Sequence, residues 1–169
     1  MSNLLSLKNL SKSFGSLQVI DSFNMHLDDG EALGIIGPNG AGKSTLFNLI
    51  TGSLNSDAGS IIFNGKNLTK TAAHVRCREG IGRSYQIPHP FGGMTVFENL
   101  LVGAAFGGGE KEIDSYENCT QLLKLTGLIN KANTLAGSLT LLERKRLEMA
   151  RALATKPKVL LLDEIAGGL

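Results

Sequence analysis

The sequence predicts an α/β fold in which β-strands flank a helical insert, and three observations carry that prediction. An apolar run at 32–36 is followed by a glycine-rich loop and then by a helical pattern. A second apolar run, at 159–162, ends in two carboxylates. The segments between about 90 and 154 show mostly helical periodicity. We therefore expect a single domain over residues 1–169, with a helical subdomain at about 90–154.

Length and composition narrow the class of protein. The 169 residues are 42% hydrophobic and 19% charged, which is typical of a globular domain with a sizeable core. Lys and Arg number 17 against 15 Asp and Glu, and the formal charge of +2 argues against a nucleic-acid partner. The apolar runs are too short to cross a bilayer. Cys77 and Cys119 are far apart and are expected to be reduced thiols.

The N-terminal part of the chain is expected to form strands. Polar and apolar residues alternate within 4–30, which predicts short strands, and residues 28–30 close the run as a turn. The run at 32–36 predicts a fully buried strand, because it is apolar at nearly every position.

A helix and another strand are expected next. The spacing of Leu46, Leu49 and Ile50 places them on one face of a helix. Residues 60–63 predict a strand, and the Asn-Gly pair at 64–65 predicts a tight turn.

The second half of the chain is expected to be helical. Two prolines and two glycines exclude regular structure at 87–93, and the glycines at 107–109 predict a flexible joint. Helical patterns cover 94–106, 110–126 and 139–154. The expected apolar face of the second helix consists of Ile113, Tyr116, Cys119 or Thr120, and Leu123. That of the third consists of Leu142, Leu147, Ala150 and Ala154.

An eight-residue segment after the first apolar run matches the pattern G-x-x-x-x-G-K-S/T at every fixed position. Its residues are Gly37, Pro38, Asn39, Gly40, Ala41, Gly42, Lys43 and Ser44. Glycines let backbone N–H groups point inward at a phosphate, and the N-terminus of the following helix adds unpaired N–H donors. Lys43 would reach the β- and γ-phosphates, Ser44 would ligate Mg²⁺, and Thr45 would add a donor near the α-phosphate. The pattern therefore predicts a nucleotide-phosphate site.

Two acids follow the last apolar run. Open α/β sheets bind ligands at the carboxyl ends of their strands. We therefore expect Asp163 to hold Mg²⁺ through a water and Glu164 to polarise the attacking water. A strand followed by a solvated acidic turn is the alternative, and the phosphate loop in the same chain favours the catalytic interpretation.

With both motifs in place, the segments between them resemble the ATP-binding subunits of ABC transporters. The likeness covers 4–169 and implies a P-loop ATPase core with an antiparallel β subdomain and a helical subdomain. Ser84-Tyr85-Gln86 is similar to the Q-loop of the family, which implies that Gln86 contacts Mg²⁺ or the attacking water. Phe14 matches the family aromatic that stacks on adenine. An ordinary strand aromatic is the alternative, and stacking does not distinguish ATP from GTP.

The resemblance also implies a signature loop, which would face the γ-phosphate bound by a second subunit. The aligned residues are Leu139, Thr140, Leu141, Leu142 and Glu143, where the family has Leu-Ser-Gly-Gly-Gln. Thr140 keeps a hydroxyl, but leucines replace both glycines. A leucine has a Cβ and cannot copy every glycine geometry, which weakens the expectation of a complete trans site. The basic run at 144–146 is interpreted as a solvent-facing side of the next helix.

Within the family, the chain looks most like importers of branched-chain amino acids, on the basis of 81–88, 91–100 and 146–151. The resemblance implies ATP and Mg²⁺ as cofactors and a second ATPase subunit, identical or a sister chain. It implies membrane-spanning permease subunits that contact the region after Gln86, and a solute-binding protein that acts indirectly. It further implies a cytoplasmic location, peripheral on the inner face of the membrane, and no nucleic acid.

The sequence ends at Leu169, where the family continues into a D-loop, further strands and a switch histidine. His26, His74 and His89 match no switch histidine and are interpreted as surface or satisfied side chains. We therefore expect a family member that is incomplete at its C-terminus. A bare sheet edge would lower its stability and favour association.

Three functions remain open at this point. The first is a transport ATPase in which two subunits sandwich two ATP molecules. The second is a nucleotide-binding module without turnover, favoured by the early end of the chain and the two leucines. The third is an ABC ATPase of DNA repair or translation, against which the near-neutral charge and the lack of a long insertion argue.

Overall fold

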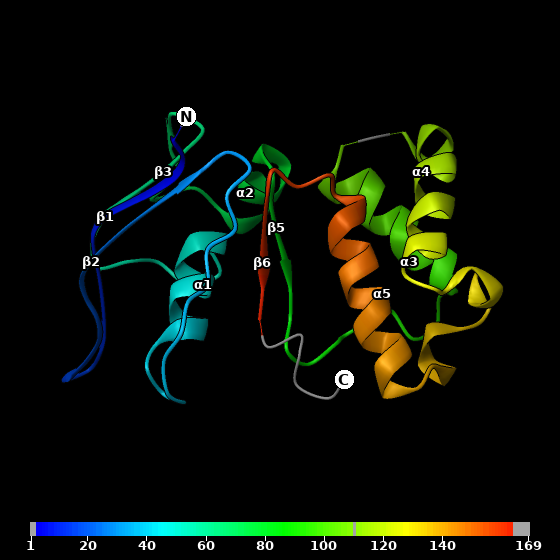
Figure 1. Ribbon diagram of the computed structural model, residues 1–169, viewed down its shortest axis with the longest axis horizontal. Coiled ribbons are helices and arrows are strands. Elements are labelled where there is room, and N and C mark those ends of the chain that lie inside the picture. Colours follow the sequence, from blue (N-terminus) through cyan, green and yellow to red (C-terminus); the bar gives the residue numbers. More distant parts are fainter. Residues whose placement is uncertain (1–2, 110, 164–169) are drawn as a thin grey trace. The chain divides into compact units, whose positions relative to one another are not determined.

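The computed structural model describes residues 3–109 and 111–163 and is drawn as a ribbon in Figure 1. The chain forms two compact units, Met1–Arg76 and Cys77–Leu169. The first holds an antiparallel sheet, and the second combines helices with a parallel strand pair. The expected α/β class with an antiparallel β region is therefore confirmed.

The first unit is built on a four-stranded antiparallel sheet with the strand order β2-β1-β3-β4. The elements of this part of the chain are β1 (Asn3–Phe14), β2 (Leu17–Asp28), α1 (Lys43–Thr51), β3 (Ala58–Phe63), β4 (Lys66–Asn67) and α2 (Ala73–Glu79). The predicted strands within 4–30 are two strands of 12 residues each. The predicted tight turn joins β3 to β4, with positive φ at both Asn64 and Gly65, as a type I′ turn requires.

The pairing of β1 with β3 builds part of the core of the first unit. Leu5 lies opposite Phe63 of β3, and Leu7 lies opposite Ile61. All four side chains are buried. Leu5 and Leu7 share one face of β1, because they are two residues apart on the strand. The predicted helix is confirmed as α1, whose buried residues include Leu46, Leu49 and Ile50.

The buried strand expected at 32–36 is wrong. The segment has no strand conformation, and the Ile36 side chain is 98% exposed. A strand is held by hydrogen bonds to a neighbouring strand, and none of the strand pairs within 3–109 and 111–163 includes this segment. An apolar run shows that a segment is suited to burial, but it does not provide the neighbour that makes it a strand.

The second unit holds a parallel pair of strands and a group of helices. Its elements are β5 (Ile81–Ser84), α3 (Val96–Val102), η1 (Gly103–Gly107), α4 (Glu112–Leu125), η2 (Ile129–Lys131), η3 (Ala136–Ser138), α5 (Leu141–Ala154) and β6 (Val159–Leu162). β5 and β6 pair in register, from Ile81 opposite Val159 to Ser84 opposite Leu162. Parallel neighbours need a long crossover, and here the helices supply it.

The helices of the second unit share one buried apolar cluster. It draws residues from α3, α4 and α5, which lie side by side in Figure 1. α3 begins at a capping box, in which Thr95 and Glu98 exchange hydrogen bonds. It continues into the π-helix η1, where the Gly108 N–H donates to the carbonyl of Gly103. Gly107, expected in a flexible joint, is therefore helical.

The apolar face of α4 differs in part from the expected one. Its buried residues are Ser115, Cys119 and Leu123. Ile113 and Tyr116 are exposed. Tyr116 instead packs its ring edge-on against Phe97, with 5.5 Å between ring centroids. Cys119 and Leu123 thus face the core as expected, whereas Ser115 is buried in place of Ile113 and Tyr116.

Candidate functional site

The glycine-rich loop has the backbone geometry that a phosphate cradle needs. Gly40 and Gly42 have φ of +84° and +88°, in the left-handed region that glycine adopts at little cost. A Cβ on Gly42 would lie 3.1 Å from the carbonyl oxygen of Val19. The Ala41 N–H donates to the Pro38 carbonyl at 3.2 Å, which tightens the turn. The loop is followed directly by α1. The first N–H groups of a helix have no intrahelical partner, so they are free to bind a phosphate.

Lys43, the first residue of α1, folds back over this loop. Its Nζ donates to the carbonyl oxygen of Gly37 at 2.6 Å and to that of Pro38 at 2.8 Å. The two carbonyl oxygens thus hold the ammonium group at the start of the loop. A phosphate oxygen could replace either of them as the acceptor. Ser44 is exposed and Thr45 is half-buried, and both lie in the first turn of the helix.

Phe14 ends β1 and is 49% exposed, so it is not a core aromatic. The Nζ of Lys12 lies 5.7 Å from its ring centroid. Asp57 fixes this end of the strand, because it accepts hydrogen bonds from Lys12 Nζ at 2.6 Å and from the Ser13 N–H at 2.7 Å. The hydrogen bond from Lys12 and then that from Ser13 hold the pKa of Asp57 below its ordinary value. The exposed ring offers a flat face for stacking.

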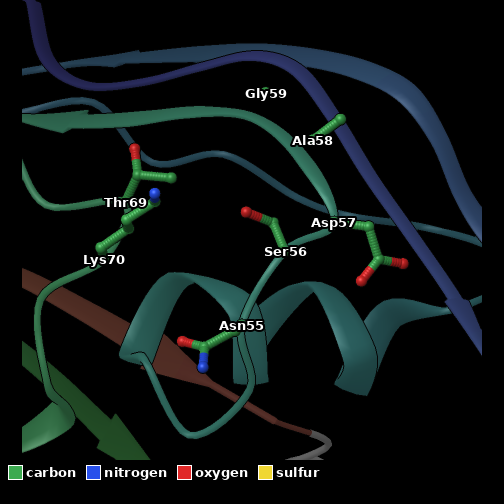
Figure 2. Close-up of a pocket in the computed structure, with 7 residues that line it drawn as sticks. All are labelled: Asn55, Ser56, Asp57, Ala58, Gly59, Thr69 and Lys70. Atoms are coloured by element: carbon green, nitrogen blue, oxygen red, sulfur yellow. The ribbon is translucent and has the colours of Figure 1, made fainter.

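A polar cavity of about 340 Å³ lies beside the chain between α1 and β3. Its lining residues are Asn55, Ser56, Asp57, Ala58, Gly59, Thr69 and Lys70. Figure 2 shows Thr69 and Lys70 on one side of it and Asp57 on the other. The Thr69 hydroxyl is already bonded to Asn67 Oδ1 at 2.6 Å. None of the residues predicted to bind nucleotide lines this cavity.

Asp163 follows β6 and forms a buried ion pair that the sequence did not reveal. Its Oδ2 accepts a hydrogen bond from the Arg83 guanidinium at 2.9 Å. The side chains of Arg83 and Asp163 are only 7% and 9% exposed. Glu164, the expected catalytic base, lies outside the described residues. Asp163 thus has a cationic neighbour on β5 that sets the position of its carboxylate.

Gln86 lies two residues beyond β5 and is exposed. Tyr85 precedes it, and its ring lies 4.7 Å from the guanidinium carbon of Arg83. The irregular segment expected at 87–93 is confirmed, since it contains no helix or strand. Arg83 is therefore in contact both with the carboxylate at the end of β6 and with the aromatic residue that leads to Gln86.

The segment aligned with the signature loop forms the start of α5. Thr140 is the N-cap, and its hydroxyl accepts from the Glu143 N–H while the Glu143 carboxylate accepts from the Thr140 N–H at 2.9 Å. Leu139 is buried, whereas Leu141 and Leu142 are 66% and 40% exposed in the first helical turn. Leu142 was expected in the apolar stripe and is not there. Right-handed helical backbone accepts any L-residue, so this conformation does not require the two glycines.

The basic run after this segment is only partly solvent-facing. Arg144 turns back, and its guanidinium donates to the carbonyl oxygens of Leu139 at 2.9 Å and Gly137 at 2.7 Å. Arg146 is exposed, as expected. Arg144 therefore fixes the chain that enters α5.

Within 3–109 and 111–163, no helix is both long and apolar enough to cross a membrane. In the same part of the chain, no three His, Cys, Asp or Glu side chains gather where they could hold a metal ion.

A family model, curated relatives and solved structures all match this chain to ATP-binding proteins of transport systems. The family model described as ABC transporter matches residues 20–167. A probable branched-chain amino acid transport ATP-binding protein, LivG, of Methanocaldococcus jannaschii is 35% identical, over 98% of this chain and 69% of that protein. The lipopolysaccharide export system ATP-binding protein LptB of Haemophilus influenzae is 33% identical, with the same two coverages. The crystal structure of an ATP-binding cassette of an ABC transporter in its ADP conformation has a TM-score of 0.86 and 34% identity, over 100% of this chain and 71% of that one.

Proposed function

This chain belongs to the ABC transporter family of ATP-binding proteins, and from that premise we propose that it binds MgATP at the loop Gly37–Ser44 to energise uptake of branched-chain amino acids or a related small solute. Membership implies ATP binding, and ATP hydrolysis by the complete protein. The chain spans 69% of the length of its M. jannaschii relative. In this proposal residues 1–169 belong to one ATP-binding domain, with 90–154 as its helical subdomain.

The observation that carries the proposal is the loop that enters α1. Two glycines with positive φ open its backbone, and Lys43 holds a positive charge against the carbonyls of Gly37 and Pro38. The β- and γ-phosphates would replace these two carbonyls as acceptors, and a charge-assisted bond to a phosphate oxygen is stronger than one to a neutral carbonyl. The remaining loop residues, Asn39, Gly40, Ala41 and Gly42, would contribute backbone N–H groups. Phe14 would stack on the base.

The donor set also suits Mg²⁺, which prefers oxygen ligands and keeps several waters. The Ser44 hydroxyl is exposed at the start of α1, and the Asp163 carboxylate is held in place by Arg83. Gln86 would add an amide oxygen. When bound, the metal would neutralise charge on the β- and γ-phosphate oxygens. Glu164 would accept the proton of the attacking water, and Gln86 would orient that water.

The proposed function also implies three kinds of protein partner. A second ATPase subunit, identical or a sister chain, would present its segment Leu139–Glu143 to the nucleotide. Permease subunits in the membrane would contact the region after Gln86, and a solute-binding protein would act only through them. The protein would lie on the cytoplasmic face of the membrane. A net charge of +2 gives no support for nucleic-acid binding.

Import and export are both represented among the relatives. The LivG protein is named for branched-chain amino acid transport and the LptB protein for lipopolysaccharide export, at 35% and 33% identity. We favour import, because the segments 81–88 and 91–100 resemble the amino-acid importers. The experiment is uptake of radiolabelled leucine by cells that lack this protein, complemented with the full-length wild type or with Glu164→Gln. Restoration by the wild type alone supports the proposal, and normal uptake in the uncomplemented cells contradicts it.

Turnover needs a separate assay, because a nucleotide-binding module without turnover is the second candidate. Phosphate release by the purified full-length protein is compared with that of Glu164→Gln. The proposal expects release above the Glu164→Gln background and equal ATP binding by both proteins. Equal phosphate release would favour the module without turnover.

A further inference from the structure

We propose that Arg83 is a positioning residue that holds Asp163, the proposed Mg²⁺-binding carboxylate, in a fixed relation to the strand that leads to Gln86. This inference rests on the proposed function, since it assumes that Asp163 and Gln86 act on the same metal and nucleotide. Arg83 itself touches no phosphate in this proposal. It acts through the two groups that it contacts.

The strand pairing brings Arg83 to the carboxyl end of β6. β5 and β6 are parallel, with Arg83 opposite Leu161 and Ser84 opposite Leu162, so Asp163 follows directly beyond the ladder. The guanidinium reaches Asp163 Oδ2 at 2.9 Å. Both side chains are more than nine-tenths buried, so water competes little for this ion pair. The pair therefore fixes the direction of the carboxylate and ties the ends of the two strands together.

The same guanidinium also lies over the Tyr85 ring, 4.7 Å from its centroid. A guanidinium is planar and can stack on a ring with its face while its edge donates to a carboxylate. Lysine has a compact ammonium group and can satisfy only the second contact well. Because Tyr85 is bonded to Gln86 along the chain, one side chain links the end of β6 to the backbone that carries Gln86.

Loss of Arg83 should therefore weaken the metal-dependent part of nucleotide binding. Without the guanidinium, the Asp163 carboxylate loses the group that orients it. Groups that orient metal ligands typically change metal affinity by about 10- to 100-fold when they are removed. Nucleotide binding in the absence of metal depends on the phosphate loop of the other unit and should change by less than about twofold.

The test measures the dissociation constant of ATP for the full-length protein with excess Mg²⁺ and again with EDTA. The constant in EDTA divided by the constant in Mg²⁺ gives the factor by which the metal tightens binding, and this factor is the ratio used below. We expect Arg83→Met to lower this ratio about tenfold and Arg83→Lys, which keeps the charge, to restore part of it. In an Asp163→Asn background, Arg83→Met should change the ratio no further, because the residue acts through Asp163. A folded Arg83→Met protein with an unchanged or larger ratio overturns the inference.

A second variant keeps the inference testable if Arg83→Met does not fold. The Tyr85 ring is about half exposed, so Tyr85→Leu removes the stacking contact at little risk to the core. We expect it to lower the same ratio by about two- to fivefold. No change in the ratio for Tyr85→Leu and for Arg83→Lys would contradict the inference. ATP that does not bind the wild type at all would instead contradict the proposed function, so the two failures are distinguishable.

Discussion

The Nζ of Lys43 donates a hydrogen bond to the carbonyl oxygen of Gly37 at 2.6 Å, so the glycine-rich loop is closed by its own lysine. A second bond, to Pro38, makes the ammonium group a bridge across the start of the loop. In the proposed function, nucleotide binding would be an exchange of acceptors, in which phosphate oxygens take the place of these carbonyl oxygens. The lysine therefore has a role in the ligand-free fold besides the one proposed for it in binding.

Replacement of Lys43 should therefore lower the stability of the protein even in the absence of nucleotide. Lys43→Met should lower the free energy of unfolding by about 1.5–3 kcal/mol, the usual value of hydrogen bonds to a charged group. Lys8→Met is the matched control, because Lys8 is exposed on β1, and it should stay within about 0.5 kcal/mol of the wild type. Urea unfolding without nucleotide measures both. Equal midpoints for the two variants would show that the bridge contributes nothing to the fold.

Replacement of Arg76 should lower the free energy of unfolding by more than replacement of Lys43 does. Arg76 binds the C-terminal end of α1. Its guanidinium is fully buried and donates to the carbonyl oxygens of Leu49 at 2.7 Å and Ile50 at 3.0 Å, in the last turn of the helix. Burial lowers its pKa, but the carbonyl dipoles at the helix C-terminus offset part of that cost. Arg76→Met removes these buried charge-assisted hydrogen bonds and should reduce stability by about 3 kcal/mol.

The matched control for Arg76 is Arg78→Met, since Arg78 is exposed and makes one long bond, at 3.4 Å, to the Phe106 carbonyl. It should change stability by less than about 0.5 kcal/mol. Denaturant unfolding followed by circular dichroism compares the two variants. Similar midpoints would mean that Arg76 does not cap α1 in solution.

Two glycines of the β3 region should respond very differently to alanine. Gly59 has φ of +86°, and a Cβ there would lie 2.3 Å from the carbonyl oxygen of Asn9, on the neighbouring strand. Backbone cannot move aside without breaking the sheet, so Gly59→Ala should prevent the first unit from folding. Gly65 has φ of +77° but open space around it, so Gly65→Ala should cost only about 1 kcal/mol. Thermal melts of the pair test this contrast, and a native-like Gly59→Ala protein would refute it.

The start of α5 predicts a pH dependence of stability. The pKa of Glu143 lies below its ordinary value of 4.5, first because the Thr140 N–H donates to it and then because the Thr140 hydroxyl does. A carboxyl whose pKa is depressed by folding stabilises the protein above its unfolded pKa, and that contribution is lost as the pH falls through the folded pKa. Glu143→Gln should therefore flatten the stability profile below about pH 4.5. An unchanged slope in urea midpoints at pH 5, 4 and 3 would contradict this.

Sequence reasoning succeeded where local chemistry decides structure. The Asn64-Gly65 turn and the helix after Gly42 depend on residues that permit or favour particular backbone angles. The glycine-rich loop is also a local signal, because its glycines and lysine lie within eight residues, and its binding of phosphate stays a prediction. Such signals are contained in short segments and can be interpreted without knowledge of the rest of the fold.

The errors concern relations between distant residues. The segment at 32–36 is apolar, but its state depends on a neighbouring strand that the run itself does not specify. Arg83 and Asp163 are 80 residues apart, and their ion pair follows only from the pairing of β5 with β6. Arg76 was missed for the same reason. Its acceptors on α1 lie 27 and 26 residues earlier in the chain.

The most direct test of the central claim is the affinity of the full-length protein for ATP with excess Mg²⁺, measured by calorimetry for the wild type, Lys43→Ala and the control Lys8→Ala. The account predicts that Lys43→Ala binds at least about 100-fold more weakly, equivalent to about 2.7 kcal/mol, while Lys8→Ala binds as the wild type does. A folded Lys43→Ala protein that retains wild-type affinity would contradict the assignment of the loop Gly37–Ser44 as the ATP site.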